Sequence, residues 1–416
     1  MSDVTIRPIQ EPEFSAWART IADAQGRDHV PGAVDRARRM LSLDRSLGAF
    51  DRGVPVGGAA LSPREMTLPG GVREDVAAVQ WTGVAPTHRR RGIFTALMRQ
   101  QLSDLYEYRR EPITVLTTRH GANPARFGYG VASQVLVMHG DIREVTFRAD
   151  VKLNGGRVVL LEEEHARPLL ESIHQRARSM NVGWVEREAK HWDALLDDVR
   201  TGSGAFTAGR IVVHLDSEDN PLGYAIFRYE VRHDDVSRDV TRLHVVEVVA
   251  VRRQAHTTLW RFLLDLDGAR QLRAEGALDE PLQLMLADPS ALTWSVADRL
   301  SVRLVDVARA LAVRRYSSPV DVVIEVRDPF CEWNEGRFRL QGDQHGADCA
   351  RATAPADLVC SVADLAAAYL GGTSLMSLAL AGRVEARSTG ALQNCSVAFK
   401  GFREPSCPAS QHWPMY

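Results

Sequence analysis

The alternation of hydrophobic and polar residues predicts a first domain in which strands and helices are mixed. After a strand at residues 4–6, Phe14, Trp17 and Ile21 share one helix face, and later apolar runs are separated by turns rich in Gly and Pro. These runs predict strands at residues 47–51, 56–61, 76–84, 113–118 and 131–138 and helices at residues 33–43 and 92–106. We therefore expect a mixed α/β domain over residues 1–148.

The same patterns predict two further domains. Residues 149–300 contain predicted strands at 157–161, 210–215, 223–229 and 243–251, predicted helices at 163–179, 186–197 and 257–266, and an apolar run at 281–286. Residues 301–416 contain predicted strands at 321–326 and 337–341 and helices at 362–369 and 375–381. All five cysteines lie in this last part: Cys331, Cys349, Cys360, Cys395 and Cys407. Their odd number and lack of CxxC spacing favour reduced, packed thiols over a zinc site or a disulfide framework.

The first two domains contain a weak internal repeat. The strand VQWTGV at residues 79–84 aligns with VEVVAV at residues 246–251, and each is followed by a basic turn and an amphipathic helix. In this register Gly92 aligns with Leu259 and Arg89 with His256. The pattern is that of a duplicated fold whose second copy has lost its loop chemistry. The alternative is a chance match between two buried strand–helix pairs.

The composition is that of an ordinary soluble protein. With 45% hydrophobic and 25% charged residues, the chain is not of the disordered or fibrous class. Its net charge of −2 gives no general attraction for nucleic acid. It has no run of 18 apolar residues and begins with a polar stretch, so neither a membrane span nor a signal peptide is predicted. We expect a cytoplasmic location.

The segment QWTGVAPTHRRRGIFTAL, residues 80–97, is the most informative motif. An apolar strand ends at Val84, four basic-capable residues (HRRR, 88–91) follow, and Gly92 opens a predicted helix. A helix start offers unpaired N–H groups and partial positive charge, glycine leaves room for an anion, and guanidinium groups add bidentate contacts. The segment therefore predicts a pyrophosphate site. The alternative, a solvated Arg-rich turn, is weakened because basic residues oppose the helix dipole unless an anion compensates.

Two motifs resemble a known family. VAPTHRRRG resembles the acetyl-CoA pyrophosphate loop of the GNAT acyltransferases, Arg/Gln-x-x-Gly-x-Gly/Ala, with Arg89, Gly92 and Phe94 in the patterned positions and Phe94 departing from the usual small residue. NPARFGYG, residues 123–130, resembles a second segment of that superfamily. Together they resemble the enhanced-intracellular-survival family of N-acetyltransferases. This resemblance implies two GNAT-like mixed-sheet domains, the second degenerate, followed by a sterol-carrier-protein-like α+β domain that VVIEVRDPF…EGRFRL would open.

The resemblance also implies a reaction and its residues. The activity would be acetyl transfer from acetyl-CoA, without a metal, to a primary amine of a small cationic molecule or a lysine, in a homo-oligomer that is a hexamer in the family. The base would be the carboxylate of Tyr416, the last residue of the third domain, inserted into the active site of the first. Residues expected to contact acetyl-CoA are Thr82, Gly83, Val84, Arg89, Arg90, Arg91, Gly92, Ile93, Phe94, Thr95, Arg119 and His120.

One position departs from the family. Where the family has a tyrosine as general acid, this chain has Pro124, which cannot donate a proton. Tyr129 is our candidate replacement, with His120 or a water molecule as alternatives. A different interpretation of Pro124 is a catalytically altered acyl-CoA- or lipid-binding protein of the same fold.

Overall fold

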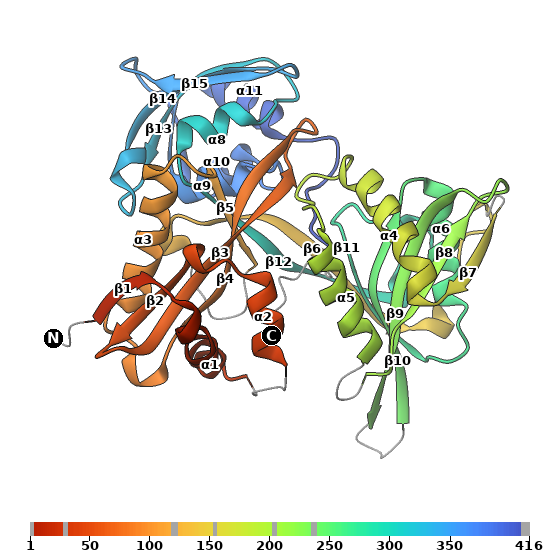
Figure 1. Cartoon of the computed structure of the whole chain (residues 1–416). Coiled ribbons are helices and arrows are strands. Elements are labelled where there is room, and N and C mark those ends of the chain that lie inside the picture. Colours follow the sequence, from red (N-terminus) through yellow and green to blue (C-terminus); the bar gives the residue numbers. More distant parts are fainter. Residues whose placement is uncertain are drawn as a thin grey trace. The chain divides into compact units, whose positions relative to one another are not determined.

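The chain forms two compact units in the computed structural model, which describes residues 4–27, 32–117, 124–152, 156–201, 206–233 and 239–408 (Figure 1). Among these residues, the first unit comprises the chain up to residue 133 together with residues 299–402. The second unit comprises residues 134–298 and 403–408. No helix among the described residues is long and apolar enough to cross a membrane.

The first unit contains a sheet whose strands follow one another largely in chain order. Its strands, in spatial order, are β1 (Val4–Pro8), β2 (Ser46–Asp51), β3 (Val54–Thr67), β4 (Arg73–Val84), β5 (Ile113–Thr117) and β12 (Leu292–Leu304). The pairs β1–β2, β2–β3, β3–β4 and β5–β12 are antiparallel. β4 and β5 are parallel, because helix α3 (Ile93–Glu107) crosses over between them.

Helices cover both faces of this sheet. α1 (Phe14–Ala24) and α2 (Ala33–Met40) share a buried cluster with Phe50 and Ala60. α3 instead packs on the preceding residues of the same two strands, Ala49 and Ala59. Because successive strand residues point to opposite faces, α1 and α2 lie on one face and α3 on the other.

The second unit repeats this arrangement. Its sheet order is β6 (Gly130–Asp141), β11 (Gln271–Gly276), β10 (Asp239–Ala250), β9 (Pro221–His233), β8 (Arg210–Leu215) and β7 (Arg157–Leu161). α6 (Arg253–Leu264) contributes to the core on one face, while α4 (Glu163–Arg178) and α5 (Ala189–Thr201) contribute to the core on the other. β10 and β11 are parallel and joined through α6, as β4 and β5 are through α3.

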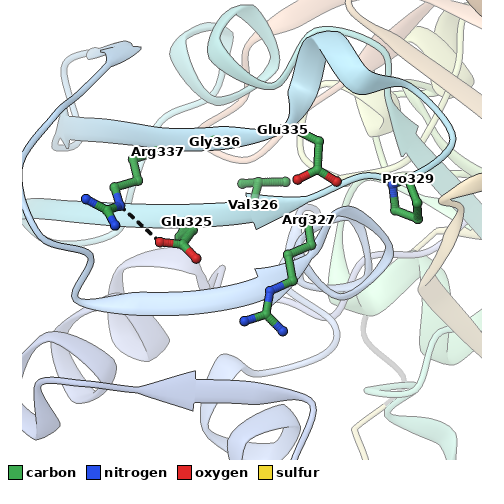
Figure 2. Close-up of a pocket in the computed structure, with 7 residues that line it drawn as sticks. All are labelled: Glu325, Val326, Arg327, Pro329, Glu335, Gly336 and Arg337. Carbon is green, nitrogen blue, oxygen red and sulfur yellow. Dashed lines mark hydrogen bonds and ion pairs between the residues drawn. The ribbon is translucent and has the colours of Figure 1, made fainter.

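The C-terminal part of the first unit is a separate sheet with helices. Its strand order is β15 (Ala347–Arg351), β14 (Gly336–Gly342), β13 (Val320–Arg327), β16 (Leu358–Ser361) and β17 (Val384–Ala386). Its helices are α8 (Val307–Val313), α9 (Val362–Ala368), α10 (Leu375–Leu380) and α11 (Thr389–Phe399). A hollow of about 460 Å³ lies at the β13–β14 hairpin, where Arg337 pairs with Glu325 (3.0 Å) and Arg327 stands apart from that pair (Figure 2).

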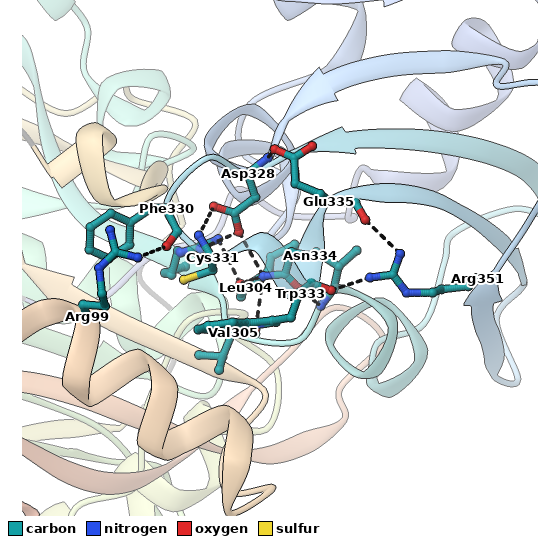
Figure 3. A network of polar contacts seen from close by, with 12 residues as sticks. Arg99, Leu304, Val305, Asp328, Phe330, Cys331, Trp333, Asn334, Glu335 and Arg351 are labelled. Carbon is teal, nitrogen blue, oxygen red and sulfur yellow. Dashed lines mark hydrogen bonds and ion pairs between the residues drawn. The ribbon is translucent and has the colours of Figure 1, made fainter.

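A buried polar network connects this sheet to β12 (Figure 3). Arg303, at the end of β12, donates to the Asp328 carboxylate at 2.5 Å, and both side chains are completely buried. The Asn334 amide donates to the same carboxylate (3.0 Å) and to the Val305 carbonyl (3.1 Å). Arg99 of α3 donates to the Phe330 carbonyl at 2.9 Å, so α3 is tied to the same loop.

The predicted elements are present, and several strands were missed. β11, β12, β15, β16 and β17, together with α11, had no predicted counterpart, while the apolar run 281–286 contains the short helix α7 (Leu282–Met285). β12 was missed because Asp298, Arg299 and Arg303 interrupt its apolar positions and because the predicted domain boundary at residue 300 falls inside it. The five cysteines are all buried, as expected, and they are not joined in disulfides.

Candidate active site

Strand β4 separates from β5 near its midpoint. The parallel ladder joins Ala77 to Thr114 and Ala78 to Val115, whereas β4 stays paired with β3 as far as Val84. The register with β3 shifts between Gln80 and Gly83, and Trp81 in this bulge has a φ of 47°. A bulky residue with positive φ is strained by about 1–3 kcal/mol, and such strain clusters at functional sites.

The bulge exposes a short length of strand backbone. Thr82, Gly83 and Val84 are partly exposed, and among the described residues no strand pairs with their β5 side. The Gln25 amide donates to the Thr82 carbonyl at 2.9 Å, which fixes the end of α1 against the bulge. A free strand edge of this kind can pair with the amides of an extended ligand.

The turn after β4 folds into a concave loop. A short 3₁₀ helix, Pro86–His88, leads to Arg90 and Gly92, whose φ values are 62° and 79°. Gly92 is the N-cap of α3 and provides no side chain to cap the helix. A Cβ at Gly92 would meet nothing within 4 Å, so the approach to the helix start is open. The N–H groups of the first turn are therefore available to an anion.

The cationic side chains around this loop have different roles. Arg89 donates to the Ala24 carbonyl at the end of α1 (2.8 Å), and His88 lies 3.2 Å from the Asp51 carboxylate. Arg90 and Arg91 are exposed, and neither guanidinium has a partner in the described part of the chain. Two free guanidinium groups at a helix start need a compensating anion.

A pocket of about 360 Å³ opens at this loop. Its lining residues are Ala24, Val84, His88, Arg89, Arg90, Gly92, Ile93, Phe94, Thr95 and Arg126. Most of the cofactor-contact residues predicted from the sequence are thus brought together. Arg91 does not line this pocket, and Thr82 and Gly83 lie on the adjoining strand.

Phe94, the departure from the GNAT pattern, has a structural partner. Its ring packs edge-to-face on Phe127, with ring centroids 5.6 Å apart. Phe127 follows Arg126 in the 3₁₀ helix Pro124–Phe127, and the Arg126 guanidinium lies over both rings. The large side chain at position 94 therefore holds the second motif, and with it Arg126, against the start of α3.

Sequence reasoning missed Arg126 and Gln25. Arg126 is exposed and adds a guanidinium to the loop pocket from a different part of the chain. Its signal was its place inside the motif NPARFGYG, which we matched only for its Gly and Tyr. Gln25 had no sequence signal, because its contact with Thr82 depends on where α1 ends.

Tyr129 is fully buried in the core below the point where the strands separate. The Thr114 hydroxyl donates to its hydroxyl oxygen at 2.7 Å, and Thr114 lies opposite Ala77 in the parallel ladder. Burial raises the pKa of Tyr129 above its usual range, so it keeps its proton at neutral pH. Pro124, at the position of the family's acid, begins the 3₁₀ helix. The predicted residues Arg119, His120 and Tyr416 lie outside the described residues.

The second unit has the same strand separation without the loop. β10 pairs with β11 only over Arg242–His244, and its ladder with β9 has a bulge between Val245 and Glu247. α6 then begins at Arg253, only three residues after the end of β10, and contains no glycine. Leu259 lies inside α6, whereas Gly92 is the N-cap of α3, so the ungapped register of the internal repeat is wrong for the helix.

Comparison with known proteins agrees with this architecture. Two acetyltransferase (GNAT) domain models match residues 5–132 and 183–304, and a sterol carrier protein domain model matches residues 307–408. GNAT acetyltransferases use acetyl-CoA as co-substrate. Each GNAT match thus falls on a sheet in which two parallel strands, joined through a helix, separate from one another.

Relatives match over nearly the whole length. An uncharacterized N-acetyltransferase of Streptomyces avermitilis is 37% identical over 97% of this chain and 98% of its own. The N-acetyltransferase Eis of Mycobacterium tuberculosis is 30% identical over 89% of this chain and 90% of its own. The crystal structure of Eis1 from Mycobacterium abscessus superposes with a TM-score of 0.83, at 30% identity over 97% of this chain and 99% of its own. The chain is therefore an acyltransferase that belongs to the Eis-like family of GNAT N-acetyltransferases.

Proposed function

We propose that the first unit transfers the acetyl group of acetyl-CoA to a primary amine of a small cationic molecule or of a lysine side chain. The observation that carries this proposal is the concave loop from Arg89 to Thr95 beside the separated end of β4. The loop is suited to binding a pyrophosphate, and the free edge of β4 is suited to binding an extended chain of amides. Acetyl-CoA contains both, with its thioester at the end of the amide-bearing arm.

The residues present fit acetyl-CoA. Arg90, Arg91 and the N–H groups of residues 92–95 would hold the pyrophosphate, and Arg126 would add a contact from the opposite wall. The backbone of residues 82–84 would pair with the pantetheine amides. Arg119 and His120 would add the remaining contacts that the family resemblance implies.

The chain's own groups would handle the protons. The Tyr416 carboxylate would accept a proton from the amine, whose nitrogen then bonds to the thioester carbon. N–H groups near Val84 would stabilise the oxyanion that develops. As the carbon–sulfur bond breaks, Tyr129 would donate its proton to the departing thiolate, and the proton held by the Tyr416 carboxylate would return to the tyrosinate through water. A free α-carboxylate has a pKa of about 3.5, so burial or a bridging water must raise its basicity.

The test is CoA release over a panel of primary amines that includes polyamines, aminoglycosides and lysine peptides. We expect turnover with at least one cationic amine. Deleting Tyr416 should remove that turnover, whereas Tyr416→Phe should keep it, because only the deletion moves the terminal carboxylate. Equal rates in all three proteins would exclude the carboxylate as base.

Pro124 favours a second candidate function, that of an acyl-CoA- or lipid-binding protein that has lost catalysis. Acetyl-CoA would then raise the melting temperature without any amine yielding CoA. The same panel, run beside a thermal shift measurement, separates the two functions.

A further inference from the structure

The second unit contains a larger cavity than the pocket in the first, about 560 Å³, which the proposed reaction does not use. It lies where β10 separates from β11. Its walls include residues 246–251 of β10 and its end, residues 275–277 at the end of β11, Trp184, the start of α6, and residues 403 and 406–408. All of these lie within the second unit.

One wall is a strand edge. β11 continues past its ladder with β10 by pairing with β6, as far as Gly276 opposite Leu136. β10 continues with β9 as far as Ala250 opposite Gly223. The side of β10 that faces the cavity therefore has no strand partner in the described part of the chain from residue 246 onward. Backbone N–H and C=O groups along such an edge bind an extended chain of amides.

The charged side chains of the cavity are paired except at one end. Glu247 is paired with buried Arg187 (2.7 Å), Asp279 with Arg403 (3.1 Å), and Glu280 with His256 (2.9 Å). By contrast, Arg252 and Arg253 are exposed, and neither guanidinium has a partner among the described residues. Glu275, the remaining carboxylate of the lining, also has an interaction partner. The unpaired charge is thus positive and lies where β10 leads into α6.

The connection between β10 and α6 determines which anion fits. It consists of Val251 and Arg252 alone, without glycine, whereas the first unit uses residues 85–92 to surround a pyrophosphate. Two adjacent guanidinium groups without a loop of N–H groups suit a single carboxylate.

The remaining walls are apolar and partly formed by the C-terminal segment. Trp184 and Trp260 are buried, and Met180 is 55% exposed at the cavity. The Trp184 indole donates to the Ser406 hydroxyl (3.0 Å), and the Ser406 N–H donates to the Val182 carbonyl (3.0 Å). The ligand would therefore carry apolar side chains that contact Met180 and the partly exposed Val246 and Val248, with the two indoles buried behind the cavity wall.

We propose that this cavity is a second binding site, for an extended apolar peptide with a free C-terminal carboxylate. The peptide backbone pairs with the free edge of β10, and its side chains contact Met180, Val246 and Val248. Its carboxylate binds Arg252 and Arg253. The site is independent of the acetyl-transfer proposal, because it uses no residue of the first unit.

The test uses a library of N-acetylated tripeptides of apolar residues with free carboxylates, and the matched library with C-terminal amides. Binding to the intact chain is followed by ligand-observed NMR and by quenching of tryptophan fluorescence. We expect binding from the carboxylate library, at least about tenfold weaker from the amide library, since a charge-assisted contact is lost. No binding from either library, or equal binding from both, would overturn the proposal.

Variants and competition locate the bound peptide. Arg252→Gln with Arg253→Gln should weaken the best peptide about tenfold, whereas Arg157→Gln, on exposed strand β7, should not. Ala277→Trp should abolish binding by filling the cavity. Saturating CoA should leave binding unchanged, and displacement by CoA would assign the peptide to the first unit. Binding seen only after residues 409–416 are removed would assign the cavity to the chain's own end. Either of these two results would overturn the proposal.

Discussion

Arg126 shows how one side chain completes a site that the Arg-rich turn begins. The turn places Arg90 and Arg91 on one side of the α3 start, and Arg126 reaches the same pocket from the 3₁₀ helix before β6. Its position depends on the edge-to-face rings of Phe94 and Phe127, over which its guanidinium lies. Arg90 and Arg126 thus line one pocket from two segments of the chain.

Replacing Arg126 should therefore affect binding of acetyl-CoA more than chemistry. For Arg126→Gln we expect the KM for acetyl-CoA to rise about tenfold while kcat stays within about twofold, because one charge-assisted contact is lost. Arg73→Gln, at the exposed beginning of β4, is the matched control and should leave both constants unchanged. An unchanged KM in Arg126→Gln would place this guanidinium outside the anion site.

Tyr129 is the residue whose role needs a kinetic measurement. Thr114 donates to its oxygen, which leaves the phenol proton free for donation, and the pair lies beside the last rungs of the β4–β5 ladder. If it protonates the thiolate, Tyr129→Phe should lower kcat about 10²-fold at an unchanged KM for acetyl-CoA.

Its stability control is another buried tyrosine. The Tyr316 hydroxyl, in the connection between α8 and β13, donates to the Leu311 carbonyl of α8, away from the loop. Both Tyr→Phe changes should lower the free energy of unfolding by about 1 kcal/mol, the usual net value of one hydrogen bond. A kcat loss shared by Tyr316→Phe, or absent from both variants, would remove Tyr129 from the proton path.

At the scale of the element, strand pairing in the second unit places a histidine between two arginines, and this makes the stability of the folded state depend on pH. His244 of β10 lies opposite Arg228 on β9 and Arg273 on β11. Burial first, and then these two guanidinium groups and Arg242, lower the pKa of His244 to about 4, while Glu230 opposes the shift. Its ring also packs against Phe206.

This arrangement should make the chain sensitive to acid. An unfolded histidine binds its proton near pH 6.5, so between about pH 6.5 and 4 the unfolded state holds more protons than the folded one. The stability is fully present above pH 6.5 and is lost as the pH falls, by up to about 3 kcal/mol from this residue. Urea denaturation at pH 7 and pH 4.5 should show a smaller loss in His244→Gln than in the unchanged chain. Equal losses would contradict this assignment.

The elements that sequence patterns predict and those they miss differ in a physical way. β7 and β8 were predicted with their observed bounds, since each is a short β-branched run between turns. β12 and β11 were missed because charged residues interrupt their apolar positions. The open start of α3 after a basic turn was predictable because its residues are adjacent in sequence, and that it binds a pyrophosphate stays a prediction. The contacts of Arg126 and Gln25 were not, because they depend on distant elements.

At the scale of the whole molecule, one buried ion pair links the two sheets of the first unit. Arg303 ends β12, and Asp328 follows β13 in the C-terminal sheet. Asp328 also accepts from the backbone N–H of Cys331 (3.1 Å) and from the Asn334 amide (3.0 Å). The carboxylate is therefore the centre on which one strand end and one loop converge (Figure 3).

Asp328→Asn should lower the free energy of unfolding far more than the loss of one exposed ion pair would. The change leaves the Arg303 charge buried without compensation, and breaking a buried pair in this way costs about 3–5 kcal/mol. Asp321→Asn breaks the exposed pair with Arg339 (2.7 Å) and should cost at most about 1 kcal/mol. Urea denaturation of both variants measures the difference.

If Asp328 only positions its loop, the double variant Arg303→Met with Asp328→Asn should be as unstable as Asp328→Asn alone. We expect the double variant instead to recover part of the lost stability, because the unpaired buried charge is then gone.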